Sequence, residues 1–163
     1  MPLYTAYNGA APTTAALTKV TTGTAIKTLL QIAPPSTRQI QVVAWGISFD
    51  GSAAATPGQV ELVQTDVAAT VTAHVASGIV KADPNGTASL VTLGTSATGY
   101  TASAEGTTAA SRLLDYQLIA PTNQYVMQFP ADSRPLVAVS TFLRIRVTFG
   151  TAINAVCWVT WIE

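Results

Sequence analysis

The chain has 163 residues, of which 48% are hydrophobic and only 10% are charged, with eight basic and eight acidic side chains. A net charge of zero supplies no positive field that would gather nucleic-acid phosphates, so no nucleic-acid partner is expected. One histidine and one cysteine exclude an internal disulfide and the ligand spacing of a zinc site. The length suits one domain with a sizeable hydrophobic core.

The first 16 residues, MPLYTAYNGAAPTTAA, show the periodicity of neither a helix nor a strand. We predict an extended N-terminal arm over residues 1–16, with Leu3, Tyr4 and Tyr7 as possible anchors on a neighbouring surface. The segment has no basic residue and no continuous apolar run, so no secretory signal is expected. Residues 17–163 are predicted to form the single folded domain.

Short apolar runs rich in Val, Ile and Thr, separated by Gly, Pro, Asn and Asp, continue along the chain and are typical of an all-β protein. Polar residues or Gly interrupt each run before it reaches the ~20 apolar residues of a membrane span, so no membrane contact is expected. The predicted strands are Lys19–Thr22, Ala25–Ile32, Arg38–Phe49, Gln59–Thr65, Arg112–Ala120, Gln124–Phe129, Val137–Phe149 and Ala155–Ile162.

Two segments between these strands are less regular. Residues 67–81 contain β-branched side chains and are predicted to be extended, although their spacing also suits a short helix. Residues 89–105 are dominated by Thr, Ser, Ala and Gly and are predicted to form a surface loop or an edge strand. About eight strands with short turns predict an antiparallel two-sheet β-sandwich, for which a jelly roll is favoured and an immunoglobulin-like strand order stays open.

The strand predicted to end at Phe149 has the clearest two-faced pattern. Leu143, Ile145 and Val147 share one face, and Arg144 and Arg146 share the other. Because guanidinium groups are costly to bury without partners, the two arginines are expected to face solvent or another molecule. Two interpretations stay open: a solvated face paired with acids such as Asp115, or a contact surface that also includes Arg134.

The few ionisable residues do not form a recognisable catalytic pattern. His74 is the only imidazole, and no Gly-x-Ser-x-Gly elbow or orienting acid accompanies it. Cys157 lies in an apolar strand, where a thiol packs as a small hydrophobic group. A glycosidase would need two of the acids at strand ends or on polar faces, which are Asp50, Glu61, Asp66 and Asp115. We therefore expect no enzyme, no cofactor and no metal, and a surface suited to packing beside other subunits.

Four stretches of the chain resemble small structural proteins encoded among the head genes of tailed bacteriophages. They are SFDGSAAATPGQVELVQTDVAATVTAHVASG (48–78), SLVTLGTSATGYTASAEGT (89–107), APTNQYVMQFP (120–130) and FLRIRV (142–147). They look like parts of a head decoration, or capsid cement, protein, and the similarity extends over about residues 13–163.

The resemblance implies a β-sandwich virion protein, made in the host cytoplasm, that binds the outer surface of the assembled head. Its implied partners are the major capsid protein and other copies of itself, often as a homotrimer. The low-charge surface suits close subunit packing, and the arm could reach across a capsomer boundary. The candidate capsid or subunit contacts are Leu3, Tyr4, Tyr7, Arg134, Arg144 and Arg146.

Three other classes of function stay open. A receptor- or glycan-binding module of a phage head or tail fibre would use exposed aromatic rings as stacking platforms, and the candidates are Tyr100, Tyr116, Tyr125 and Trp161. A shell-forming coat protein would be expected to assemble alone and commonly carries a basic arm, which is absent here. An enzyme is the weakest alternative, and a His74→Ala variant would test it.

Overall fold

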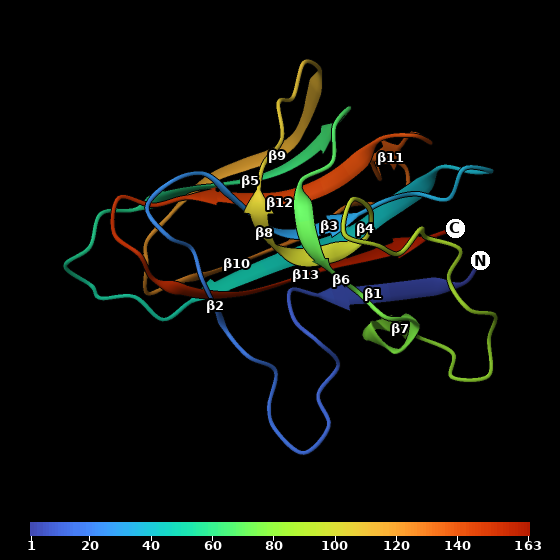
Figure 1. Ribbon diagram of the computed structural model, residues 1–163, viewed down its shortest axis with the longest axis horizontal. Helices are drawn as coiled ribbons and strands as arrows, with labels where there is room; N and C mark the ends of the chain where they lie inside the picture. The colour runs from blue at the N-terminus through green and yellow to red at the C-terminus, as the bar shows by residue number, and fades with distance from the viewer.

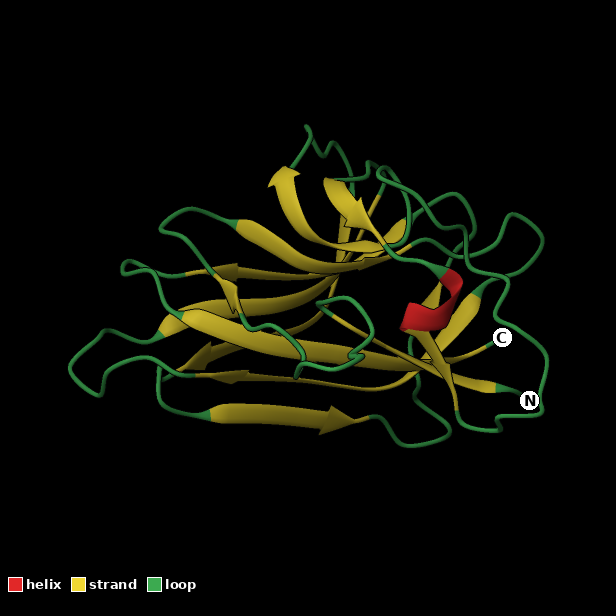
Figure 2. Ribbon diagram, turned by 60° about the horizontal axis from the view of Figure 1, so that its bottom comes forward, coloured by secondary structure: helices red, strands yellow, loops and turns green.

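The computed structural model describes residues 1–163, and strands packed as two antiparallel sheets dominate it (Figures 1 and 2). The predicted all-β, two-sheet sandwich is confirmed, whereas jelly-roll connectivity is a finer statement that stays a prediction. The single helical element is the 3₁₀ turn η1 (Ala76–Gly78), drawn in red in Figure 2. No helix has the length and apolar character needed to cross a membrane.

Sheet A has seven strands. Its path runs β10-β4-β13-β1-β7, while β11 pairs with β4 and β2 pairs with β13. Its strands are β1 (Leu3–Tyr7), β2 (Val20–Thr21), β4 (Ile40–Phe49), β7 (Ile79–Lys81), β10 (Gln124–Gln128), β11 (Leu136–Val137) and β13 (Asn154–Ile162).

Sheet B packs over the inner face of sheet A and has six strands in the order β6-β8-β3-β12-β5-β9. Its strands are β3 (Lys27–Ile32), β5 (Gly58–Thr65), β6 (Thr70–Ala73), β8 (Gly99–Ala104), β9 (Ser111–Ile119) and β12 (Phe142–Thr148). The chain passes repeatedly from one sheet to the other, as at β3, β4 and β5, so strands that are neighbours in sequence help to form opposite sides of the core.

The hydrophobic core fills the space between the sheets. Alternate residues of β13 point inward, and they are Ala155, Cys157, Val159 and Trp161. From sheet B, the predicted apolar face Leu143, Ile145 and Val147 is buried against them. Each fully buried large apolar side chain contributes about 1.5–3 kcal/mol relative to an exposed one, so these two strands supply much of the driving force for folding.

The N-terminal segment differs from the predicted extended arm. Leu3–Tyr7 forms β1, an interior strand of sheet A between β13 and β7, and Tyr4 and Ala6 are buried in the core of the same chain. Strands on both sides supply hydrogen-bond partners to this short segment, which its own five residues could not indicate. The rest of the predicted arm, residues 8–16, belongs to the loop of residues 8–19, which hangs below sheet A in Figure 1.

Three other segments also differ from the sequence prediction. Val137–Phe149 is divided into β11 and β12, and Ser140 between them has a positive φ of 60°. The segment 89–105 contributes β8, which lies inside sheet B between β6 and β3 and is not an edge strand. Residues 67–81 contain β6, η1 and β7, so the extended prediction holds for the two strands and the helical alternative for one short turn.

Candidate contact surfaces

The outer face of sheet A has no carboxylate, amine, guanidinium or imidazole among its side chains. Strand register sets adjacent outward residues side by side, so Tyr7, Trp158, Gly46 and Val126 form one row across four strands. We call this surface the uncharged face. Its outward residues are Leu3, Thr5, Tyr7, Thr21, Gln41, Ala44, Gly46, Ser48, Val80, Gln124, Val126, Gln128, Leu136, Asn154, Val156, Trp158, Thr160 and Ile162.

Several large apolar side chains on the uncharged face are open to solvent. Val126 is 59% exposed, Val80 49%, Leu136 42% and Tyr7 38%. A soluble surface usually intersperses charges among such groups, and exposed apolar patches without them mark sites of interaction. The uncharged face therefore has the composition of a contact surface.

Trp158 lies flat across β4 because residue 46 is glycine. A Cβ atom at Gly46 would stand 2.8 Å from Cε2 and Nε1 of the indole, which is too close for any other residue without movement. The indole N–H groups of Trp45 and Trp161 donate to Asp115 and Glu163, each at 3.1 Å. The Trp158 N–H has no acceptor within the chain, so this half-buried indole can still bind an outside group.

A small apolar pocket adjoins the uncharged face at the end of β1. The loop after β1 turns back beside the sheet, and Pro12 and Leu17 of the loop line the pocket together with Tyr7 and Val80. Its volume is about 310 Å³. This pocket continues the apolar surface of the sheet onto the loop.

Arg144 was predicted to face solvent or a partner, and the structure corrects this prediction. The side chain lies on the outer face of sheet B but is fully buried, because the loop before β6 and the end of β8 cover it. Nη1 donates to Glu105 O at 3.1 Å and lies 3.5 Å from Glu105 Oε2, and Nη2 donates to Val67 O. Burial lowers the pKa of the Arg144 guanidinium, and the Glu105 carboxylate partly opposes this shift. Arg144 therefore links β12 to other segments of the same chain and is not free to contact another molecule.

The remaining predicted contact residues do not form one site. Arg146 is mostly buried in an ion pair with Glu61, with Nε 2.6 Å from Oε1 but not in line for a hydrogen bond. Tyr4 is buried and donates to Thr87 O at 3.1 Å, so it cannot anchor a neighbouring molecule. Arg134 is half-buried and comes just before β11, which pairs with β4 at the edge of sheet A opposite to β1 and β7. Leu3 and Tyr7 alone belong to the uncharged face.

His74 and Cys157 are both enclosed by the chain. His74 Nε2 lies 2.8 Å from Tyr7 O, its ring centre lies 4.8 Å from that of Tyr100, and burial lowers its pKa. Burial also raises the pKa of the Cys157 thiol, which packs in the core as the sequence indicated. No group of three His, Cys, Asp or Glu side chains is placed to hold a metal ion.

The aromatic residues named as stacking platforms are mostly covered. Trp161 is fully buried, and Tyr100 and Tyr125 are half-buried, which leaves Tyr116 at 42% exposure. The sequence analysis did not single out Trp158. Its outward position follows from the alternation of β13, because Cys157 and Val159 on either side of it point inward.

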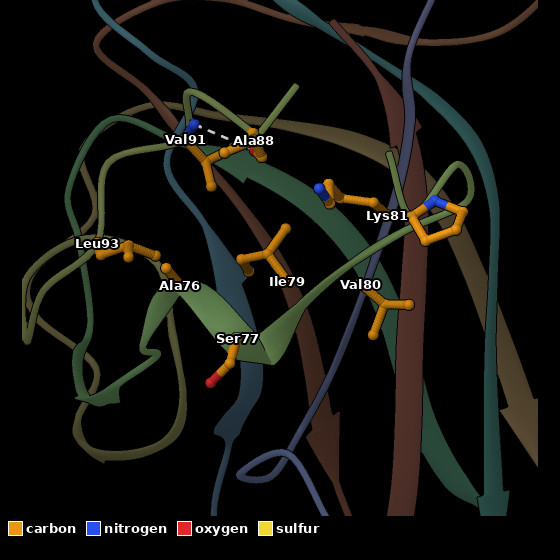
Figure 3. Close-up of a pocket in the computed structure, with 10 residues that line it drawn as sticks. Ala76, Ser77, Ile79, Val80, Lys81, Ala88, Val91 and Leu93 are labelled. Carbon is orange, nitrogen blue, oxygen red and sulfur yellow. Dashed lines mark hydrogen bonds between the residues drawn. The ribbon is translucent and has the colours of Figure 1, made fainter. Parts of the chain in front are cut away.

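A second hollow, of about 380 Å³, lies between β7, η1 and the segment that precedes β8 (Figure 3). Ile79, Val91 and Leu93 form much of its wall, and the Lys81 side chain extends over it. Lys81 Nζ already donates to Gly86 O at 2.8 Å. The hollow is shallow and lacks converging polar groups, so the uncharged face is the better candidate for a functional surface.

Comparison with protein-family models, with curated proteins and with solved structures finds no match to the chain. Any assignment of function therefore begins from the surfaces described above.

Proposed function

We propose that the chain is a structural virion protein that binds the outer surface of an assembled phage capsid and stabilises the shell as a decoration protein. The uncharged face of sheet A carries this proposal, and the resemblance of residues 13–163 to head decoration proteins supports it. A face without charges can be covered by a neighbouring protein without the cost of removing ions from water. Its exposed valines and aromatic rings contribute apolar contact.

A protein of this kind needs only modest affinity at each site. Because it would bind the assembled shell and not the separate subunits, binding favours the assembled state by mass action. The effect is repeated at every equivalent position of a symmetric particle, so small contributions add over the shell. The homotrimer implied by the resemblance stays a prediction, as do the location on the head surface and the lack of enzyme activity.

The test is the occupancy of purified capsids by variants with one charge on the uncharged face. Val126→Lys and Val80→Glu each place a charge at an exposed position, where the fold tolerates it. Val75→Lys is the matched control, since Val75 is 63% exposed and lies before η1, outside the uncharged face. We expect roughly tenfold weaker capsid binding for the first two variants and unchanged binding for the control, corresponding to about 1.4 kcal/mol.

Absence of the chain from purified virions would contradict the proposed function. If the two variants and the control occupied capsids equally, the chain would still be a capsid-binding protein. The uncharged face would then be rejected as its contact surface.

A second candidate function is the glycan-binding module of a phage head or tail fibre. Trp158 favours it, because a flat indole with an unused N–H beside Gln124 and Gln128 can stack on a neutral sugar ring and bond its hydroxyls. Titration with neutral oligosaccharides, followed by tryptophan fluorescence, tests this candidate. A saturable change that Trp158→Ala abolishes would support it, and no change with any sugar would reject it.

A further inference from the structure

Two asparagines of the chain, Asn8 and Asn85, are followed directly by glycine. In an Asn-Gly pair, the backbone nitrogen of the glycine can attack the side-chain amide carbon of the asparagine, because glycine has no Cβ atom to hinder the approach. The reaction needs an asparagine side chain that is free to turn and a glycine nitrogen that can leave its hydrogen bond. The surroundings of the two pairs differ in both respects.

Asn8 is held by the core of the protein. It is fully buried, its Nδ2 donates to Ala155 O at 3.2 Å, and its Oδ1 accepts from the Cys157 N–H at 3.0 Å. Turning this side chain toward the Gly9 nitrogen would break both bonds and leave buried polar groups without partners. The fold therefore protects the Asn8-Gly9 pair.

Asn85 has none of these restraints. It is exposed in the loop between β7 and β8, beside the N-terminus (Figure 1), and its side-chain amide makes no hydrogen bond within the chain. Asp83 alone accepts from the two backbone N–H groups of the pair. Asn85 N–H donates to Asp83 Oδ1 at 2.9 Å, and Gly86 N–H donates to Asp83 O at 3.0 Å. Both bonds lie in a solvent-facing turn, where water can replace them.

We propose that the fold selects Asn85, and not Asn8, as a site of spontaneous deamidation. The Gly86 nitrogen forms a bond to Asn85 Cγ, the Cγ–Nδ2 bond breaks, and Nδ2 leaves as ammonia with the proton lost from the Gly86 amide. Water then opens the cyclic imide at one of its two carbonyl carbons. Opening at Cγ gives aspartate, and opening at the backbone carbonyl gives isoaspartate. Either product adds one negative charge to a chain whose net charge is zero.

Isoaspartate also changes the turn itself. Its main chain runs through the former side chain and is longer by one carbon, which displaces the carbonyl groups that follow. Gly86 O accepts from Lys81 Nζ at 2.8 Å, and Thr87 O accepts from Tyr4 Oη at 3.1 Å. The modification therefore acts on the contacts that hold this loop against β1 and β7.

The purified chain is sufficient to test the proposal, which does not depend on capsid binding. The folded protein is incubated at mildly alkaline pH, because the deprotonated amide nitrogen is the nucleophile. Its peptides are then followed by mass spectrometry with electron-transfer fragmentation, which distinguishes aspartate from isoaspartate. We expect the Asn85 peptide to be converted and the Asn8 peptide to stay unchanged. In urea, which removes the protection of Asn8, both peptides should be converted at similar rates.

Gly86→Ala tests the route, because an added methyl group hinders attack by the nitrogen of residue 86, and we expect conversion of Asn85 to be about tenfold slower. The new Cβ would stand 3.2 Å from Asp83 O, a contact that a small shift of the exposed turn relieves. Gly150→Ala is the matched control, since an added Cβ there meets nothing within 4 Å, and Asn85 should be converted at the wild-type rate.

Three results would overturn the proposal. One is conversion of Asn8 as fast as Asn85 in the folded chain, and another is conversion of Asn85 only in urea. The third is a Gly86→Ala variant in which Asn85 is converted at the wild-type rate.

Discussion

The outer faces of the two sheets differ in their polar side chains and in what covers them. On sheet B, Arg144, Gln31 and Thr28 are fully buried, because the chain folds its own loops over them and supplies their partners. On sheet A, the corresponding surface has no charged group and is left open. A buried guanidinium requires acceptors held in fixed positions, which a chain provides most readily for itself. A face without charges makes no such demand and can be covered by another molecule.

The largest expected effect comes from removing the charged group that sheet B buries. Arg144→Met leaves Glu105 O and Val67 O without their guanidinium donor and removes the cation beside the Glu105 carboxylate, so we expect a loss of about 3 kcal/mol in the free energy of unfolding in urea. Arg146→Met is the comparison, because the side chains of Arg146 and Glu61 stay 15% and 21% exposed and keep some contact with water, so we expect a smaller loss than for Arg144→Met. Equal losses would remove the distinction between the covered and the open parts of that face.

Asp115, at the side of the sandwich between the two sheets, also tests the cost of removing the partner of a buried polar group. Its carboxylate accepts from Trp45 of β4 and Tyr125 of β10, and burial together with this carboxylate raises the pKa of Tyr125 to about 12. Asp115→Ala leaves the buried Trp45 N–H without its acceptor, so we expect a loss of about 2 kcal/mol in the free energy of unfolding. The exposed Asp132→Ala should change stability by less than about 0.5 kcal/mol. Matching values for the two variants in thermal unfolding would contradict this role.

Gly46→Ala changes the open face without adding a charge. The new methyl group would meet the Trp158 indole at 2.8 Å and force it away from β4, at a cost of about 1–2 kcal/mol. Tryptophan emission should shift to longer wavelength as Trp158 becomes more exposed. Gly150→Ala is the control, since an added Cβ there meets nothing within 4 Å. An unchanged emission spectrum in Gly46→Ala would mean that the indole does not rest on β4.

His74 gives the smallest effect, and it appears only in acid. Because burial lowers its pKa below the ordinary 6.5, the unfolded chain binds a proton more readily than the folded chain as the pH falls through about 6.5. This residue should therefore reduce stability by at most about 1.4 kcal/mol per pH unit, down to its pKa in the folded state. Urea midpoints measured for wild type and His74→Gln should diverge in that range. Parallel curves would show that His74 does not titrate differently on folding.

Sequence patterns predicted the sandwich because the evidence for it is local. Alternation along β12 identified Leu143, Ile145 and Val147 as a buried face. Alternation also placed Arg144 on the opposite face correctly. It could not reveal that this face is covered, because Val67 and Glu105 are brought to Arg144 only by the fold.

The contact surface was harder to predict for the same reason. The uncharged face combines residues from seven strands, and none of its short segments is unusual alone. The low overall charge suggested that some surface would lack charges, but only strand register shows which one. In β1, Tyr4 and Ala6 are buried in the core while Thr5 and Tyr7 lie on the outer face, but a segment of five residues is too short for the sequence to distinguish a strand from an extended arm.

Oxidative footprinting of the assembled particle tests the central claim most directly. Hydroxyl radicals modify accessible aromatic side chains, and the modified peptides of free protein and of purified virions can be compared by mass spectrometry. If the uncharged face docks on the shell, Trp158 and Tyr7 should be modified in the free chain and protected on the particle. Modification of both residues to the same extent in the two samples would contradict the assignment of this face as the contact surface.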